Sequence, residues 1–521
     1  MPCPRLNVIV CLATLSFSAV IDGFSAVQRR AHHATTTTLQ LWPAVKDEKK
    51  TDSIEEGEDN DKQSALLKKL FDATGSSSLR STSQTDAIGQ KKSDTDESEE
   101  SDIPPEVLKP FSLLILSQFI LFLGVGAVIP AIPLYGQSIG LSSASNGIVI
   151  STPAVALLLV SRFAGVFADK GRKAAMMSGM FIIAIADCGT ALSNNLTTLI
   201  AARLGLGLGR GLAEAGERGM LTDLANQAPS LRGRALAIQQ ASVAIGIAIG
   251  APAGGFIVEE YGVRSSFLCV SAAALAALGL YALLPETVSN PESDETSTSN
   301  SEESSTDNEA DAWVELLKNS QTWRSLTICQ AGVSVGYACK IAIIPILASS
   351  ILGGATGAGL LLSAAGLSGL GGAVIGGTLS DQIGSRKAAA LSGTLSGIAL
   401  ASIPVGLSLE DRIGSNAFET VVGGPDATIF AVLVILWSVA VSAQGPALTS
   451  LGQLNAKKGL EATSLGLPRA AGDATYIVAP LILGAVSDRL GDTIPGAACA
   501  VAGFAIILGS AALFTIEGGK E

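Results

Sequence analysis

Twelve apolar runs, each long enough to cross a lipid bilayer as a helix, dominate this chain of 521 residues. A helix needs about 20 mostly apolar residues to span the hydrocarbon core of a membrane. Within that core only helices and closed barrels satisfy every backbone polar group. The sequence therefore predicts an all-α membrane protein with six spans on each side of an acidic segment, at residues 111–136, 145–167, 174–193, 197–221, 233–257 and 264–284, and then at 323–349, 355–379, 388–408, 427–452, 462–485 and 494–516.

The charged residues of the chain are few and unevenly placed. They make up 15% of the residues, against about 25% in soluble proteins. The net charge of −12 comes mainly from residues 47–109 and 285–322, which are rich in Ser, Thr, Asp and Glu. Both segments lack apolar periodicity and are predicted to be disordered. The acidity thus belongs to a tail and a linker, and no nucleic-acid partner is indicated.

Residues 1–46 have the composition of a targeting presequence. Residues 1–26 have one Arg, a short apolar core and small residues, as secretory signal peptides do. The following segment contains Arg, His and four consecutive Thr but no acid before Asp47, which is typical of transit peptides. Together they resemble the bipartite presequence of algae with secondary plastids, which favours the plastid envelope. The alternative is a plain secretory signal with a disordered tail, and then another endomembrane or the plasma membrane.

Residue types that carry enzyme chemistry are scarce in this chain. His32 and His33 are the two histidines, and both lie in the presequence. The seven cysteines form no CxxC pair, so no zinc site or disulfide framework is indicated. The Gly-rich stretch at 205–211 lies inside an apolar run, where helix packing is favoured over nucleotide binding. We expect no enzyme, no cofactor and no metal ion.

Lys and Arg are concentrated in the loops on one side of the predicted membrane. Cytosolic loops of membrane proteins carry an excess of these residues. The residues on the basic side are Lys170, Arg172, Lys173, Arg232, Arg234, Arg386, Lys387, Lys457 and Lys458, against Arg264, Arg412 and Arg489 on the other side. The basic side, with both tails and the linker 285–322, is therefore predicted to face the cytosol or stroma.

Two short motifs occur once in each half of the chain. The stretch "ADKGRKAA" at 168–175 returns as "SDQIGSRKAA" at 380–389. Likewise "APAGGFIVEEYG" at 251–262 has a counterpart in "APLILGAVSDRLG" at 479–491. Parallel six-helix repeats are a transporter architecture, with the substrate site near the midplane between them.

The repeated loops resemble a signature of the major facilitator superfamily. The second copy is similar to that family's GxxxDxxGxRK loop, and the first is one residue shorter, which favours a shorter or weaker first latch. The matching residues are Gly377, Asp381, Gly384, Arg386 and Lys387, preceded by Gly165, Asp169, Gly171, Arg172 and Lys173. The resemblance implies two pseudo-symmetric six-helix bundles at 110–284 and 323–516, a tail at 517–521, a monomer, and loops that act as gating latches.

Two further motifs support this resemblance. Arg203-x-x-x-Gly207-x-Gly209 is similar to the family's RxxxGxG motif. The run at 233–257 resembles the GxxxGPxxGG element of drug:proton antiporters of the tetracycline-efflux type, with its Pro displaced by one position. Its residues are Gly246, Gly250, Pro252, Gly254 and Gly255.

In the latch loops, the physical chemistry suggests a role for each residue. Asp169 or Asp381 precedes a helix N-terminus, where the helix dipole favours an anion. Arg172 or Arg386 can pair with an acid elsewhere in the bundle, and glycine permits a tight turn and close approach. A basic turn that only sets topology is the alternative interpretation.

Charged residues inside the run 197–221 indicate a polar cavity. An Arg at the bilayer centre costs about 3 kcal/mol even on the lenient scale, so these side chains must line a wet cavity or pair with one another. Arg203, Arg210, Glu214, Glu217 and Arg218 fall within about 100° of helical arc. Contact of Arg210 or Glu214 with substrate or a coupling proton is one interpretation, and mutual i,i+4 pairing is the other. Glu217 and Arg218 are expected to be structural.

Other polar residues within the apolar runs are further candidates for the cavity. By resemblance to the family, the candidates are Gln118, Tyr337, Lys340 and Gln444, and the run 462–485 adds Arg469, Asp473 and Tyr476 on one face. Asp187 is either a proton site or a partner of an Arg. Arg210 and Lys340 favour an anionic substrate unless internal pairing cancels them.

These observations favour a secondary transporter of a small organic solute by alternating access, coupled to protons, with antiport favoured. With no histidine outside the presequence, the coupling protons must use carboxylates such as Glu214, Asp473 and Asp187, since burial disfavours their charged form. A transporter-fold receptor or assembly factor without transport activity is the alternative. The expected partners are the solute, protons and the lipid bilayer.

Overall fold

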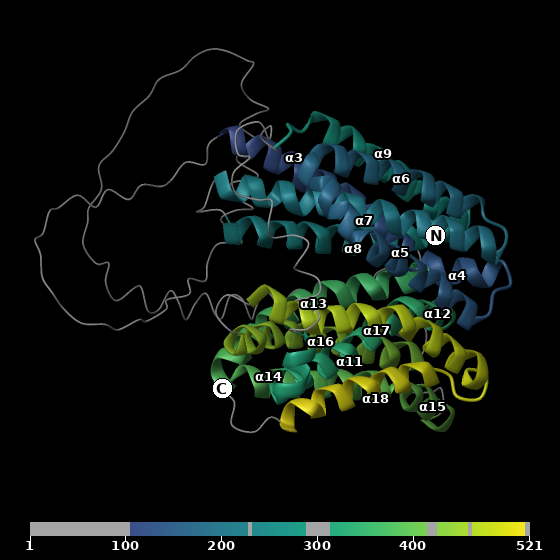
Figure 1. The fold of residues 1–521 in the computed structure, drawn as a ribbon. Helices are drawn as coiled ribbons and strands as arrows, with labels where there is room; N and C mark the ends of the chain where they lie inside the picture. The colour runs from purple at the N-terminus through teal and green to yellow at the C-terminus, as the bar shows by residue number, and fades with distance from the viewer. Residues whose placement is uncertain (1–104, 228–231, 288–312, 414–424, 457–460, 516–521) are drawn as a thin grey trace, which may run out of the picture.

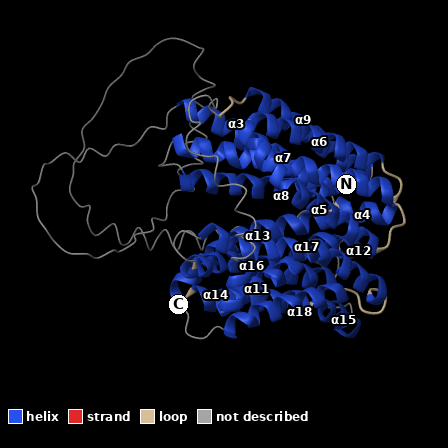
Figure 2. Ribbon diagram, viewed as in Figure 1, coloured by secondary structure: helices blue, strands red, loops and turns tan. Residues whose placement is uncertain are grey.

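The computed structural model describes residues 105–227, 232–287, 313–413, 425–456 and 461–515. The described residues contain helices and no strand (Figure 2). The presequence and most of the acidic tail and linker lie outside them. The helices of the first half are α3 (Pro105–Val128), α4 (Ala131–Ser138), α5 (Ser143–Lys170), α6 (Arg172–Leu192), α7 (Leu196–Gln227), α8 (Arg232–Tyr261) and α9 (Val263–Leu283).

The second half repeats this order of helices. Its elements are α11 (Gln321–Ala342), α12 (Ile344–Ile351), α13 (Ala355–Ile383), α14 (Ser385–Ala401), α15 (Ile403–Ile413), α16 (Pro425–Asn455), α17 (Glu461–Leu490), α18 (Ala497–Ala511) and the short 3-10 helix η3 (Ala512–Thr515). Figure 1 shows the two halves as separate bundles, one purple to teal and the other green to yellow. The bundles meet mainly where α5 packs on α17 and α8 packs on α13.

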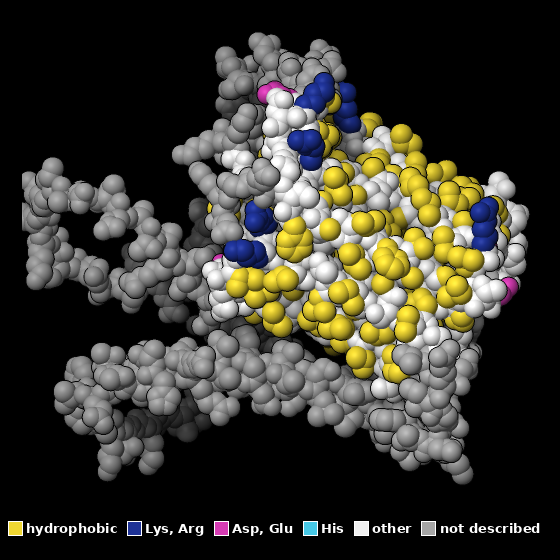
Figure 3. Space-filling view, turned by 90° about the horizontal axis from the view of Figure 1, so that it is seen from below, with side chains coloured by type: hydrophobic (Ala, Val, Ile, Leu, Met, Phe, Trp, Pro, Cys, Tyr) yellow, Lys and Arg dark blue, Asp and Glu magenta, His cyan; other side chains and the backbone are white. Residues whose placement is uncertain are grey.

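The structure agrees with the predicted all-α membrane fold. Ten helices of the described residues are long and apolar enough to cross a membrane, and the pair α11–α12 is an eleventh if it is one span. Helix α7 is not counted, because its charged residues lower its hydropathy. Hydrophobic side chains cover much of the face seen in Figure 3, with Lys and Arg near its edges. Such a large apolar surface fits contact with lipid.

Proline breaks two of the predicted spans at equivalent places. The run 111–136 divides into α3 and α4 at Pro130, and the run 323–349 divides into α11 and α12 before Pro345, with a bend of 41°. Proline has no N–H for the helical hydrogen bond and its ring crowds the preceding turn. The third broken run, 388–408, divides into α14 and α15 at Ser402 and extends further than predicted, to Ile413.

One end of the linker differs from the prediction of disorder. Residues 313–319 are helical. Trp313, Leu316 and Leu317, spaced as neighbours on one helix face, pack against the core of the second bundle. The prediction is therefore wrong for this short stretch, because its apolar face has a partner that the linker composition does not reveal.

The glycines of the antiporter-like motif provide close helix contacts. Gly246, Gly250 and Gly254 share one face of α8 and lie against the α3 backbone at Phe119, Leu123 and Ala127. Gly255 points the other way, against Ala355 and Thr356 at the start of α13. Because a side chain at these positions would meet backbone atoms, the motif holds α8 against its own bundle on one face and against the second bundle on the other.

Candidate functional site

A cavity of about 730 Å³ lies between the two bundles. Its wall combines α3, α4, α5, α6, α7 and α9 of the first half with α11 and α17 of the second. Most of the wall is apolar, and its charged members lie chiefly on α7 and α17. Of the predicted cavity residues, the wall includes Arg203, Arg210, Glu214, Arg469 and Asp473.

Three charged residues of α7 are mutually paired on the cavity wall. The Glu214 carboxylate accepts hydrogen bonds from Arg210 Nη2 at 3.0 Å and from Arg218 Nη2 at 2.8 Å. Both partners lie one turn away along the helix, the spacing at which such pairs form. Glu214 therefore lies at the centre of an Arg–Glu–Arg triad that faces the space between the bundles.

Glu217 lies on the same helix but is almost fully buried, with 6% of its surface exposed. Its carboxylate accepts hydrogen bonds from the Tyr281 hydroxyl at 2.6 Å and from Gln118 Nε2 at 3.0 Å. These contacts tie α7 to α9 and α3. The predicted residue Gln118 therefore lies inside the first bundle rather than on the cavity wall, because its amide finds a buried carboxylate there.

Asp187 and Arg203 form a second ion pair at the cavity wall. Arg203 Nη1 lies 3.9 Å from Asp187 Oδ1, and the two side chains are only 3% and 2% exposed. The Arg203 guanidinium also lies over the Phe267 ring, 5.1 Å from its centroid, in a cation–π arrangement. Of the two roles left open for Asp187, the structure shows the ion pair.

Three predicted cavity residues of the second bundle have partners away from the cavity wall. Gln444 is fully buried, and its Nε2 contacts Cys329 Sγ at 3.2 Å and Ser510 Oγ at 3.3 Å. Lys340 Nζ lies 6.0 Å from the ring centroid of Trp437, and Tyr337 meets the same ring edge-on. An aromatic face attracts a cation, which accounts for the position of Lys340.

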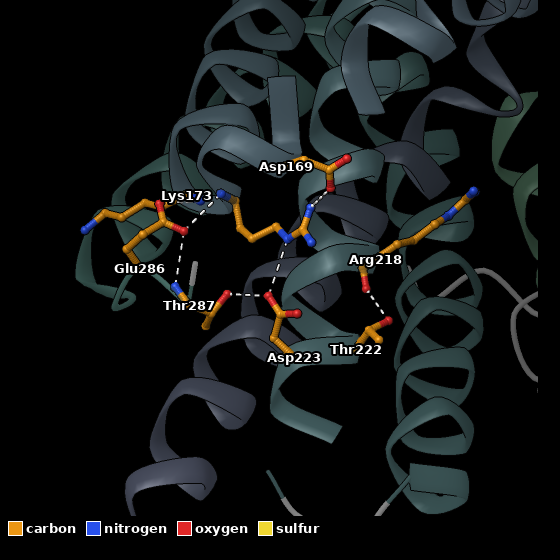
Figure 4. A network of polar contacts seen from close by, with 8 residues as sticks. Asp169, Lys173, Arg218, Thr222, Asp223, Glu286 and Thr287 are labelled. Atoms are coloured by element: carbon orange, nitrogen blue, oxygen red, sulfur yellow. Dashed lines mark hydrogen bonds and ion pairs between the residues drawn. The ribbon is translucent and has the colours of Figure 1, made fainter. Parts of the chain in front are cut away.

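The first latch loop is a network of charges within the first bundle (Figure 4). Arg172 pairs with Asp169 at 2.5 Å and with Asp223 near the end of α7 at 3.3 Å. Asp223 also accepts a hydrogen bond from the Thr287 hydroxyl at 2.7 Å. Asp223 was not predicted from the sequence, since nothing in the local pattern indicates that the end of α7 meets this loop.

The anion at the start of α6 is Glu286, whereas the sequence pointed to Asp169. The Glu286 carboxylate accepts from the backbone N–H of Arg172 at 2.9 Å and of Lys173 at 3.2 Å. Asp169 instead bonds the Arg172 side chain. Gly171 has an extended backbone, with φ −176°. This turn is one residue shorter than its repeat, and the acid at the N-terminus of α6 comes from the segment that follows α9.

The second latch loop is built from a different set of contacts. Gly384 has φ +88°, a conformation that favours glycine. A chain of hydroxyls joins Ser380 to Ser385 at 2.7 Å and Ser385 to Ser450 at 2.9 Å. The structure shows no ion pair of Asp381 with the described residues. Gly165 and Gly377 lie one helical turn before Asp169 and Asp381. A side chain at either position would meet open space, so a close contact between helices does not explain the glycine there.

Two acids clamp the bundles together on the face opposite the basic loops. Glu259 at the end of α8 accepts hydrogen bonds from the Thr356 backbone N–H at 2.9 Å and hydroxyl at 2.7 Å, at the start of α13. Asp488 at the end of α17 accepts from the backbone N–H of Ser143 at 2.7 Å and of Ala144 at 2.9 Å, at the start of α5. Both carboxylates thus cap a helix of the other bundle, where the dipole favours an anion.

We call the face opposite the basic loops the outer face. Replacing these acids by amides is expected to destabilise the conformation in which the two bundles are closed on this face. A cap or a charge at a helix N-terminus contributes about 1 kcal/mol, so Glu259→Gln or Asp488→Asn shifts the equilibrium toward an open outer face by about fivefold. The measurement is the alkylation rate of a single cysteine placed at Ile132 on the cavity wall, in a background without other cysteines. Glu260→Gln, at the neighbouring exposed acid, is the control. Equal rates in Glu259→Gln and Glu260→Gln would contradict the prediction.

The fold and the cavity together define the class of protein: a helical membrane protein of two repeated bundles with a charged cavity between them. The family model for the Major Facilitator Superfamily matches residues 114–480. The chain belongs to this superfamily, as the repeated loops suggested.

Curated relatives match one part of the chain. The quinolone resistance protein NorA of Staphylococcus aureus is 28% identical over 153 residues, which is 29% of this chain and 39% of the relative. Multidrug resistance protein 1 of Bacillus subtilis is 28% identical over 185 residues, 35% of this chain and 47% of the relative. The matched region thus spans less than half the length of either relative.

Solved structures support the fold over a larger share of the chain. A bacterial homologue of the human lysosomal transporter Spinster, in an inward-facing and occupied conformation, has a TM-score of 0.62 at 14% identity and covers 79% of this chain and 96% of its own. The nucleoside transporter NupG has a TM-score of 0.57 at 15% identity and covers 78% and 100%. At these identities the likeness concerns the fold alone.

Proposed function

We propose that the protein is a secondary transporter that moves a small organic solute across a membrane by alternating access. The observation that carries this proposal is the charged cavity of about 730 Å³ between two repeated bundles. Transporters of repeated architecture hold their substrate between the repeats and expose it to each side in turn as the repeats rock. The names of the relatives and structural neighbours, which are resistance proteins and transporters, point in the same direction.

Coupling to protons, with antiport favoured, is part of the proposal. Glu214 is the carboxylate best placed for it, since it faces the cavity while it bonds both Arg210 and Arg218. Protonation of Glu214 would remove its charge and release two cationic side chains toward the cavity. The charge state of Glu214 would therefore control whether the wall of the first bundle offers free cationic groups to a solute.

Glu214→Gln is expected to abolish uptake driven by a pH gradient and to leave solute counterflow intact. Gln keeps the shape and one acceptor oxygen but takes up no proton. Purified protein in vesicles is tested with solutes of the classes in the relatives' names, quinolones and nucleosides, with and without a proton gradient. Asp492→Asn, at an exposed acid outside the cavity, is the control. An unchanged dependence on the pH gradient in Glu214→Gln would rule out this role, and vesicles that show neither uptake nor counterflow would count against transport itself.

We propose the plastid envelope as the location, and residues 1–46 as a presequence that is removed. The tail 47–109 and the linker 285–322 are then on the same side as the basic loops, and the mature protein acts as a monomer. A fluorescent protein joined to residues 1–46 tests the address. Retention of this fusion in the secretory pathway, or its secretion, would favour the alternative of a plain signal peptide.

A further inference from the structure

The second bundle contributes one cation and one anion to the cavity wall, both on α17. Arg469 and Asp473 are spaced i,i+4, so they lie one turn apart on the same face of the helix. Both side chains are exposed, and both line the cavity opposite the charged face of α7. This pair is therefore in a position to meet a solute that enters between the bundles.

The two residues differ from the other charged groups of the wall in having no partner among the residues that the structure describes. Glu214 bonds two arginines, Asp187 pairs with Arg203, and Glu217 is held by two hydrogen bonds. Arg469 and Asp473 form no ion pair or side-chain hydrogen bond with any described residue, and they do not pair with each other. Side chains at this spacing commonly do pair on a helix, so both charges remain available to a ligand.

The charge balance of the wall indicates what such a ligand must carry. Its four arginines, at 203, 210, 218 and 469, face four acids, at 187, 214, 217 and 473. A cation would neutralise Asp473 and leave Arg469 in a closed cavity without a counter-charge, and an anion would do the reverse. Enclosing an unpaired charge is costly. A solute that carries both charges satisfies both residues and keeps the closed cavity neutral.

The geometry adds two further requirements. Four residues of helix advance by about 6 Å, so the two charges of the ligand must be separated by several bonds. The rest of the wall is mainly apolar, with Phe122, Val125, Ile150 and Leu157 among its members, and accommodates a hydrophobic body. Charge-assisted hydrogen bonds at the two ends would then fix the orientation of the solute.

We propose that the cavity recognises an amphipathic zwitterion, with its anionic group at Arg469 and its cationic group at Asp473. This inference rests on the proposed transport function and names its substrate class. Arg210 and Lys340 were the two cations predicted to favour an anionic substrate. Arg210 is paired with Glu214, and Lys340 lies against Trp437 away from the cavity wall, so neither supports that prediction.

The test uses four probes built on one scaffold. They are 4-amino-3-phenylbutanoate, which is a zwitterion, its primary amide, which is a cation, its N-acetyl derivative, which is an anion, and the N-acetyl amide, which is neutral. Equilibrium binding to the purified full-length protein is measured for each. We expect the zwitterion to bind about 10- to 100-fold more tightly than either singly charged probe, the range of one charge-assisted hydrogen bond. Similar affinities for all four probes, or no binding of the zwitterion, would overturn the proposal.

Variants assign the two ends of the ligand. Arg469→Gln is expected to abolish the preference for the zwitterion over the cation, because it weakens zwitterion binding and removes the unpaired charge that penalises the cation. Asp473→Asn is expected to abolish the preference for the zwitterion over the anion for the corresponding reason. The exchange Arg469→Asp with Asp473→Arg keeps both charges and is expected to retain the preference for the zwitterion. Arg489→Gln, on α17 but outside the cavity, is the control. An equal loss for all four probes in the single variants would overturn the assignment.

This binding experiment is independent of the transport assay. A protein that transports solutes in vesicles but shows no preference for the zwitterion would contradict the substrate class and leave the transport function intact. A protein that binds the zwitterion through Arg469 and Asp473 but moves no solute would contradict transport and leave the recognition site intact.

Discussion

Arg203→Gln is expected to lower the free energy of unfolding by about 3–5 kcal/mol, the cost of removing one partner from a buried ion pair. The change leaves the Asp187 carboxylate, which is 2% exposed, without its counter-charge. It also removes the guanidinium from the Phe267 ring. The measurement is thermal or denaturant unfolding of the purified protein in detergent. This pair joins α6 to α7, so we expect the first bundle to lose stability as a unit.

The matched control removes both charges together. Arg203→Gln combined with Asp187→Asn leaves no buried charge, and the double variant is expected to recover most of the lost stability. Replacing a whole buried ion pair by neutral groups is often close to neutral. If the double variant were as unstable as Arg203→Gln alone, the loss would come from packing around the guanidinium, and the ion pair would not be its cause.

Gly255→Leu is expected to reduce transport by about 5- to 150-fold with little effect on the fold of either bundle. A Cβ at this position would lie 2.7 Å from Thr356 Cα and 2.8 Å from the Ala355 carbonyl carbon, across the contact between α8 and α13. Overpacking of this kind costs about 1–3 kcal/mol. That is enough to shift the equilibrium away from a closed outer face by about 5- to 150-fold. The measurements are counterflow in vesicles and cysteine accessibility at Ile132.

Gly279→Leu provides the control for this change. Gly279 lies on α9, and a side chain there would meet open space, so the same substitution is expected to leave transport and accessibility unchanged. Equal transport in Gly255→Leu and the unaltered protein would contradict a role for this contact in the transport cycle. A loss of folding in Gly255→Leu would show that the glycine is needed within its own bundle.

The sequence was sufficient to predict the twelve apolar runs, their division into halves and the family, because hydropathy and repeated loops are local signals. The ends of the helices were less accurate. Pro130 and Pro345 were visible, yet an apolar run continues through each, so the breaks were not predicted. Trp313 was assigned to the linker because its packing partner lies in another part of the chain.

The candidate site was also predicted only in part, because the sequence shows which residues are polar but does not show which partners from other parts of the chain they meet. Charges inside α7 and α17 had to face a cavity, and seven of them line it. Gln118 and Gln444 were also predicted to line the cavity, but both are buried inside their own bundles. Which face of a helix meets the cavity and which meets a neighbouring helix depends on tertiary packing. The clamping acids Glu259 and Asp488 lay within the repeated motif at 251–262 and 479–491. That repeat was the available signal, but nothing local to it shows that each acid reaches a helix of the opposite half.

The clamps also bear on the speed of transport. They lie at pseudo-equivalent positions of the interface, so a rocking motion that opens the outer face must break both. If each contributes about 1 kcal/mol, each alone slows opening about fivefold, and together they slow it about 25-fold. A chain with only one clamp would open its outer face faster but would spend more time open to the outside without cargo. The duplicated acid thus sets a balance between the rate of opening and leakage.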